Sequence, residues 1–188
     1  LEKGKALENE GHYEDAIEIY NRIDDTYTDY AEVLAQMGNC YMRLQDLDSA
    51  ETYYRQSLAH LANGYTAGMG LGLLDIQMNR FNDAINRFLD ITKLKPDSDK
   101  AWSGLGIAYR KTERIIYAMD ALSRALKINI ENKAAMNNLL ELSYQENSFK
   151  QIEPVIKKYL EKHPTNTNIL FGLAGVYFKS NRINDAQI

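Results

Sequence analysis

The sequence predicts an all-α fold, built from pairs of short antiparallel helices that recur at a constant spacing. The first observation is a column of evenly spaced alanines, Ala16, Ala50, Ala84 and Ala118, with Ala186 two periods further on. The second is that apolar residues within each period fall at three- and four-residue steps in two blocks. The third is composition: the chain has three prolines in 188 residues and no long apolar–polar alternation. One helix pair cannot bury its own apolar stripe, so neighbouring pairs must stack around a shared core.

The period divides the chain into consecutive repeats without insertion or deletion. A partial repeat covers residues 1–30, and the following four complete repeats and one partial repeat cover 31–64, 65–98, 99–132, 133–166 and 167–188. Polar segments such as "QDLDS" (45–49) separate the two helical blocks. We therefore expect residues 1–188 to form one array. Because neither end carries the polar face that a terminal repeat needs, we expect the chain to be part of a longer protein.

One repeat, 133–166, departs from the pattern in its second half. Ile152 replaces the column alanine, and Pro154 follows shortly after it. A proline inside a helix removes a backbone hydrogen bond and clashes with the preceding turn. We therefore expect this second helix to start late or to be kinked, and this repeat to be the weakest of the array.

The segment "WSGLGIAY" (102–109) carries a recognisable motif, W-x2-L-G-x2-Y. Ala118 and Leu122 continue the pattern in the next helical block, and Pro96 and Pro164 stand at its closing position. These residues resemble the tetratricopeptide repeat, and the resemblance extends over the whole chain. It implies a right-handed α-solenoid of antiparallel helix pairs, with a repeat of about 34 residues, whose first helices line a concave groove. It also implies that a peptide or a helix of a partner protein binds in that groove.

The glycine-rich stretch "YTAGMGLGLL" (65–74) invites comparison with a phosphate-binding loop. Such loops follow a strand and open a helix, whereas this stretch falls inside the first helix of its repeat. Gly72 occupies a position where we expect the two helices of the repeat to approach closely, beside Ala84. The stretch therefore predicts close helix packing and not a nucleotide site.

A second glycine column contains Gly70, Gly104 and Gly172. The resemblance turns this column towards the concave side of the array. We interpret it as space left for a ligand.

The resemblance also assigns side chains to the wall of the groove. These are Asn39, Arg43, Met69, Leu73, Ile76, Ile107, Arg110, Lys111, Asn137, Asn138, Tyr144, Phe171 and Phe178. Met69, Leu73, Ile76 and Ile107 would form an apolar centre. Exposed apolar patches of this kind mark interaction surfaces, so we expect this centre to contact the ligand.

The charged residues at groove positions indicate what the ligand carries. The basic members are Arg43, Lys100, Arg110, Lys111 and Lys179, against the acidic Glu32 and Glu141, which gives +3 within a chain of net charge −4. We therefore expect an extended or helical protein segment with apolar anchors and acidic flanking residues. Another part of the parent chain, or a second copy of it, is the alternative occupant.

Other function classes lack support in the sequence. His12, His60 and His163 lie apart without metal-ligand spacing, and Cys40 is the only cysteine. We expect no catalytic site, no metal and no cofactor. The mildly acidic charge argues against nucleic acid, and no apolar run approaches the roughly 18 residues of a membrane span. We expect a soluble protein without membrane insertion and favour a cytoplasmic location.

Two further functions remain as alternatives to a binding scaffold. The chain could be a structural scaffold that assembles with itself through repeat ends and edges. It could also be the regulatory or recruitment arm of a larger multidomain enzyme. An array extended to its natural ends that stays monomeric would count against the first, and the sequence beyond residue 188 would decide the second.

The first prediction concerns the helix contact in the second complete repeat. Ala84→Glu should lower the thermal midpoint, because it forces bulk and charge into a packed contact, and overpacking alone costs about 1–3 kcal/mol. Circular dichroism melting measures this effect. An unchanged midpoint would contradict the packing register.

Overall fold

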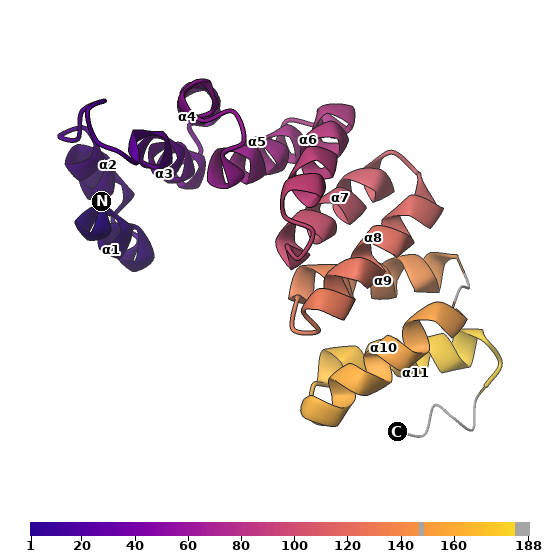
Figure 1. Ribbon diagram of the computed structural model, residues 1–188. Coiled ribbons are helices and arrows are strands. Elements are labelled where there is room, and N and C mark those ends of the chain that lie inside the picture. Colours follow the sequence, from indigo (N-terminus) through magenta and orange to yellow (C-terminus); the bar gives the residue numbers. More distant parts are fainter. Residues whose placement is uncertain (147–148, 183–188) are drawn as a thin grey trace. The chain divides into compact units, whose positions relative to one another are not determined.

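The computed structural model of the chain describes residues 1–146 and 149–182, with residues 149–151 described as backbone only (Figure 1). All regular secondary structure in these residues is helical, and the prediction of an all-α fold is confirmed. The helices divide into two compact units, Leu1–Pro96 and Asp97–Ile188. Each unit is described by itself.

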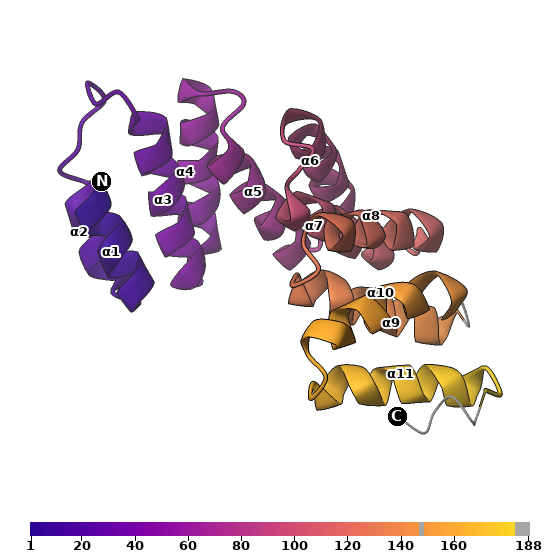
Figure 2. The ribbon, with the colours of Figure 1, turned by 60° about the horizontal axis from the view of Figure 1, so that its bottom comes forward.

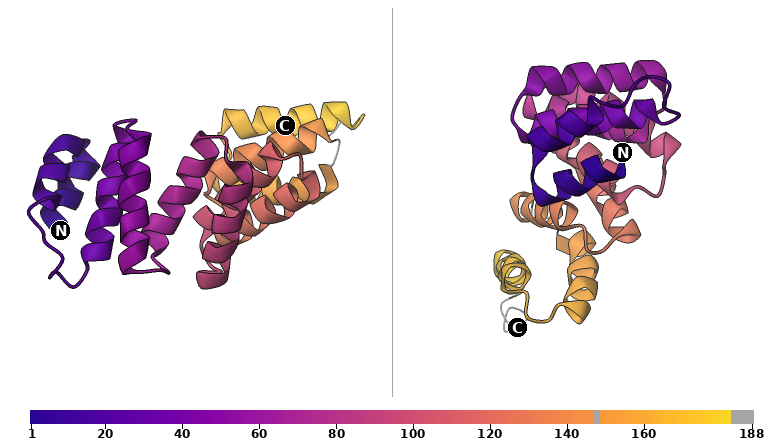
Figure 3. Two further views of the ribbon diagram at one scale, coloured as in Figure 1. Left: turned by 90° about the horizontal axis from the view of Figure 1, so that it is seen from above. Right: turned by 90° about the vertical axis from the view of Figure 1, so that its left-hand side faces the viewer.

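Unit 1 consists of three helix pairs, and the paired helices α3 and α4 lie side by side in Figures 2 and 3. Its helices are α1 (Glu2–Glu10), α2 (Tyr13–Tyr20), α3 (Tyr30–Arg43), α4 (Leu47–His60), α5 (Tyr65–Gln77) and α6 (Phe81–Leu94). The helices of unit 2 are α7 (Asp99–Lys111), α8 (Ile115–Ile128), α9 (Lys133–Gln145), α10 (Phe149–Lys162) and α11 (Thr167–Lys179).

The second helices of successive pairs begin in strict register. They start at Leu47, Phe81, Ile115 and Phe149, each one full period after the one before. The expected late start of α10 is therefore wrong, and Pro154 stands inside the helix. Tertiary packing outweighs the proline, since Ile156, just beyond it, is fully buried. A kink at Pro154 stays a prediction.

Turn chemistry sets both ends of the first helices. Three of them begin at capping residues one period apart, Ser98, Asn132 and Asn166, whose side chains accept hydrogen bonds from backbone N–H groups of the first turn. Where the structure describes the whole turn after a first helix, that turn contains one residue with positive φ. These residues are Gly11, Gln45, Asn79, Glu113 and Asn181, with φ between 58° and 84°. The left-handed residue reverses the chain and lets the second helix return along the first.

Close approach within a pair depends on a glycine in the first helix. A Cβ atom on Gly38 would lie 2.6 Å from the ring of Tyr54, and one on Gly72 would lie 2.7 Å from that of Phe88. No real Cβ atom tolerates such distances, so the glycines admit the rings. The nearest atoms to Gly72 thus belong to Phe88 and not to Ala84, which is itself fully buried. The close packing predicted at Gly72 is present, and the Phe88 ring supplies the atoms nearest to it.

The Tyr54 ring also fills the space beside Gly70 in the next repeat. A Cβ atom on Gly70 would lie 2.2 Å from that ring, and the Tyr54 hydroxyl donates a 2.7 Å hydrogen bond to Asn39 Oδ1. At Gly172 the equivalent space holds Leu140, again 2.2 Å from a Cβ position. The interpretation of this glycine column as open ligand space is therefore wrong at both positions, because neighbouring side chains occupy it.

Ion pairs link neighbouring helix pairs at equivalent positions of the two units. In unit 1, Glu51 of α4 contacts Arg80 in the turn before α6, with 2.9 Å between the charged atoms. In unit 2, Glu153 of α10 contacts Arg182 in the turn after α11 at 2.5 Å. The two partners are 29 positions apart in both pairs, and the pairs lie three periods from one another. The same register thus sets both electrostatic and apolar contacts.

Asp75 adds a buried carboxylate to the unit 1 network. It interrupts the column that holds Tyr41 and Tyr109, and its side chain is 1 % exposed. Arg80 and Arg87 approach its two oxygens at 2.7 and 2.6 Å. Two guanidinium groups therefore compensate the burial of this charge.

The second prediction compares alanine at two glycines. Gly70→Ala should destabilise the chain, because the new methyl group clashes with the Tyr54 ring. Overpacking costs about 1–3 kcal/mol, and with a Cβ only 2.2 Å from the ring we expect this cost to exceed the gain of about 1 kcal/mol from better helix propensity. Gly175→Ala is the control: its Cβ would meet Tyr144 at an ordinary 3.8 Å, so only the gain remains. In denaturant unfolding, the stability of Gly175→Ala should exceed that of wild type, and that of Gly70→Ala should be the lowest. The reverse order would show that the Tyr54 ring does not fill the space beside Gly70.

The third prediction concerns pH. Hydrogen bonds from Arg182 and then Lys157 lower the pKa of Glu153 to about 2. A depressed carboxyl pKa contributes stability above the unfolded value of about 4.3, and the contribution is lost as pH falls towards 2. Thermal midpoints measured between pH 5 and 2 should therefore fall more steeply for wild type than for Glu153→Gln. Parallel curves would show that the Glu153 contacts do not stabilise the fold.

Candidate functional site

In unit 1, the predicted groove residues lie on α3 and α5 with different degrees of exposure. Leu73 is 46 % exposed and Ile76 is half-buried, so both can meet a ligand. Met69 is only 9 % exposed and belongs mainly to the core, which differs from the expectation that it contributes to an open apolar centre. The Asn39 side chain already has hydrogen-bond partners within the chain. Its Oδ1 accepts from the Tyr54 hydroxyl, and its amide nitrogen donates to Gln36 Oε1 at 2.8 Å. Among the predicted groove residues of unit 1, the accessible apolar side chains are therefore Leu73 and Ile76.

In unit 2, the predicted residues of α7 include a charged link to α9. Ile107 is half-buried and Lys111 is exposed. Arg110 forms an ion pair with Glu141, an anionic member of the predicted groove. One positive and one negative groove residue thus neutralise each other. The remaining positive charge on α7 lies at Lys111 and Lys100, both exposed.

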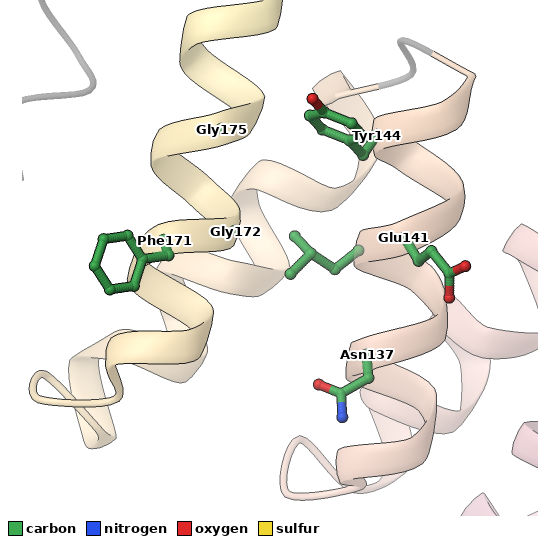
Figure 4. Close-up of a pocket in the computed structure, with 7 residues that line it drawn as sticks. Asn137, Glu141, Tyr144, Phe171, Gly172 and Gly175 are labelled. Atoms are coloured by element: carbon green, nitrogen blue, oxygen red, sulfur yellow. The ribbon is translucent and has the colours of Figure 1, made fainter.

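Helices α9 and α11 line an open hollow of about 290 Å³ (Figure 4). Its lining consists of Asn137, Leu140, Glu141, Tyr144, Phe171, Gly172 and Gly175. Three of these, Asn137, Tyr144 and Phe171, are among the predicted site residues. Figure 4 shows Asn137 and Tyr144 at opposite ends of the hollow, with Glu141 pointing away from α11. Asn138 is instead bonded to its own helix, through the Ala134 carbonyl at 2.8 Å.

Small residues on α11 create the hollow. Gly172 leaves room for the Leu140 side chain, which forms part of the apolar wall. A Cβ atom built on Gly175 would lie 3.8 Å from the Tyr144 ring, which is an ordinary contact distance. The glycine therefore leaves space between the two helices. Leu140 was not predicted as a site residue. Its signal in the sequence is that it replaces glycine in the column of Gly38 and Gly72.

Lys179 contacts Tyr144, which lines one end of the hollow. Its ammonium group donates to the Tyr144 carbonyl oxygen at 2.5 Å and lies 4.4 Å from the centre of the Tyr144 ring. The hydrogen bond and the cation–π contact both orient the ring. A cation therefore stands at the edge of an aromatic surface.

Large apolar side chains extend the site beyond the hollow. Phe171 is 78 % exposed, Phe178 is 72 % exposed and Tyr144 is 49 % exposed. Phe171 and Phe178 lie about two helical turns apart and share one face of α11. Side chains so exposed contribute little to folding, and a contiguous exposed apolar surface marks an interaction site.

Cys40 is buried, and burial raises the pKa of its thiol to about 12, so the thiol stays protonated near neutral pH. Within the described ranges, no three side chains of the metal-binding types gather closely enough to hold an ion. None of the helices described here is long and apolar enough to cross a membrane.

Comparison with known proteins agrees with the repeat geometry. Two family profiles described as tetratricopeptide repeat match residues 8–67 and 69–134. Cellulose synthase operon protein C of Pseudomonas fluorescens (strain SBW25) is 27 % identical over 165 residues, which are 80 % of this chain and 13 % of that protein. The peroxisomal targeting signal receptor of Saccharomyces cerevisiae is 29 % identical over 118 residues, which are 63 % of this chain and 19 % of that receptor. The chain spans less than a fifth of the length of either relative.

A solved structure extends the likeness to the three-dimensional fold. The crystal structure of a tetratricopeptide repeat protein from Parabacteroides merdae matches with a TM-score of 0.72 and 18 % identity, over 98 % of this chain and 73 % of that one. At this identity the match shows the fold alone. The sequence profiles, the repeated helix pairs and this structural match agree, and the chain belongs to the tetratricopeptide repeat family.

Proposed function

We propose that the chain binds a segment of another protein along the inner faces of its first helices, with an apolar side chain of the ligand seated between α9 and α11. The hollow lined by Tyr144, Leu140 and Phe171 carries this proposal. Its volume of about 290 Å³ lies at the lower limit of small-molecule pockets, which span about 300–1,000 Å³. A single side chain of a peptide suits it better than a whole cofactor.

Family membership supports the same class of function. Tetratricopeptide repeats generally mediate protein–protein interaction and are typically non-catalytic scaffolds, and stacked repeats offer extended concave surfaces for binding. One relative of this chain is by name a receptor for a targeting signal. These facts favour a binding scaffold over an enzyme.

Charge indicates the composition of the ligand. At the groove positions of unit 2, Lys100, Arg110, Lys111 and Lys179 stand against Glu141, which gives a net charge of +3. In unit 1, Arg43 and Glu32 balance. A ligand of the unit 2 surface should therefore carry acidic residues beside the apolar side chain that enters the hollow.

The fourth prediction tests the hollow with peptides selected from a random display library against the wild-type chain. Gly175→Leu should lower the affinity of the selected peptides at least tenfold, because the new side chain fills the hollow without adding charge. Ile107→Glu should weaken the binding of ligands that extend from the hollow to α7 of the same unit. Fluorescence anisotropy with labelled peptides measures the affinities.

The matched control is Ile128→Glu, which changes an exposed apolar residue (43 %) on a second helix. It should leave peptide affinity unchanged, and circular dichroism should show equal helicity in all variants. Peptides that bind Gly175→Leu as well as wild type would place the binding site elsewhere.

A further inference from the structure

The start of α8 presents an apolar surface that the proposed groove does not use. Ile116 is 82 % exposed and the adjacent Tyr117 is 64 % exposed. The Tyr117 ring contacts Tyr109, with 5.4 Å between ring centres, which fixes its direction. The exposed cations Lys111 and Arg114 lie at the two ends of the turn that leads into the helix. We call Ile116, Tyr117, Arg114 and Lys111, of which only Lys111 is also a predicted groove residue, the α8 patch.

The same positions of other second helices are polar, so the patch is not a requirement of the fold. The equivalent residues are Glu14 and Asp15 in α2, Asp48 and Ser49 in α4, and Asn82 and Asp83 in α6. The repeat therefore folds with polar residues at these two positions. Ile116 and Tyr117 are apolar but mostly exposed, so they add little to the core of the chain. Their exposure therefore points to a contact with another molecule.

The electrostatics of the patch favour a negatively charged partner. The first turns of α2, α4 and α6 contain acidic residues, whereas α8 has none there and no side-chain cap. The N-terminal end of a helix carries partial positive charge and attracts anions. Lys111 and Arg114 add two cations against one acid in the turn, Glu113, while Asp120 is paired with Arg124 at 2.9 Å. The partner should therefore combine an apolar side chain with carboxylates.

The chain itself exposes such a segment in unit 1. Helix α2 ends at Tyr20, which is earlier in its repeat than His60, the last residue of α4, is in the next. The connection from α2 to α3 is therefore longer than the connection from α4 to α5. In this connection Tyr27 is 41 % exposed, and Asp24, Asp25 and Asp29 surround it in the sequence. We call residues 24–29 the Tyr27 loop.

Local hydrogen bonds give the Tyr27 loop a defined conformation. The Tyr27 N–H donates to the Asp24 carbonyl oxygen at 3.1 Å, and the Thr26 N–H donates to Asp24 Oδ1 at 3.1 Å. Bonds from Thr26 also lower the pKa of Asp24, with the Thr26 hydroxyl as the first cause, so the loop stays anionic near neutral pH. A loop that is already ordered loses little entropy on binding.

We propose that the Tyr27 loop of one copy docks on the α8 patch of a second copy. Tyr27 would pack on Ile116 and Tyr117, and the aspartates would face Lys111, Arg114 and the start of α8. The contact joins two different surfaces, so each pair keeps one unused loop and one unused patch, and chains of copies can grow. It is small, and small interfaces are weak; salt should weaken it further by screening the charges.

The fifth prediction uses two variants that each disable one side of this contact. Ile116→Glu removes the patch and keeps the loop, while Tyr27→Ser removes the loop and keeps the patch. Sedimentation velocity should show concentration-dependent, salt-sensitive association of wild type and a monomer for each variant alone. Mixed, the two variants retain one working loop and one working patch, so they should form a 1:1 dimer that does not grow. Asp25→Lys, a charge reversal at an exposed position of the loop, should behave like Tyr27→Ser.

Ile128→Glu on the same helix is the matched control and should associate as wild type does. Association that persists in both single variants would show that other surfaces, such as the ends of the array, make the contact. That result, a wild type that is monomeric at every concentration, or a variant mixture that stays monomeric would each overturn the proposal. Neither Ile116→Glu nor Tyr27→Ser changes a groove residue, so the peptide experiment above stands or fails separately.

Discussion

The structure depends on one steric constraint: in the pairs α1–α2, α3–α4, α5–α6 and α7–α8, a large side chain of the second helix sits directly against the backbone of the first helix. Gly38 under Tyr54 and Gly72 under Phe88 illustrate it, with no room for even a methyl group. The rings bring the paired helices close enough to share a core, and the interiors of proteins tolerate such contacts only when shapes match closely. Tyr54 also reaches Gly70 of the next repeat, so the same ring sets the spacing within a pair and between pairs.

The candidate site lies where this arrangement changes. In the fourth complete repeat the bulky Leu140 replaces glycine on the first helix, and the small residue that accommodates it is Gly172 on α11. Leu140 then points between two first helices, and with Tyr144 it forms an apolar wall of the hollow. Because the helix pairs obtain their stability from the buried columns, Phe171 and Phe178 need not be buried for folding. A surface can vary in this way without changing the scaffold beneath it.

The regular part of the fold could be predicted because the alanines (Ala16, Ala50, Ala84 and Ala118) and the glycines of the close helix contact (Gly38, Gly72 and Gly106) recur at equivalent positions of successive repeats. Other features could not, because different residue types serve the same geometry. Gln45 and Glu113 adopt positive φ in turns where glycine or asparagine is expected, so no composition signal marks those turns. Met69 was assigned to the groove by position, and only its packing shows that it is mostly core. The space beside Gly70 could not be recognised as filled, since the side chain that fills it belongs to another helix of the preceding repeat.

The most direct test of the packing account is a double-mutant cycle between Gly72 and Phe88. Gly72→Ala introduces the methyl group that the ring excludes, and Phe88→Leu shortens the side chain that causes the clash. If the contact is as described, the double variant is more stable than the sum of the single effects allows, by a coupling energy of about 0.5 kcal/mol or more in denaturant unfolding. Strictly additive effects would mean that the two residues do not set the distance between the helices, and the account of the fold would be wrong.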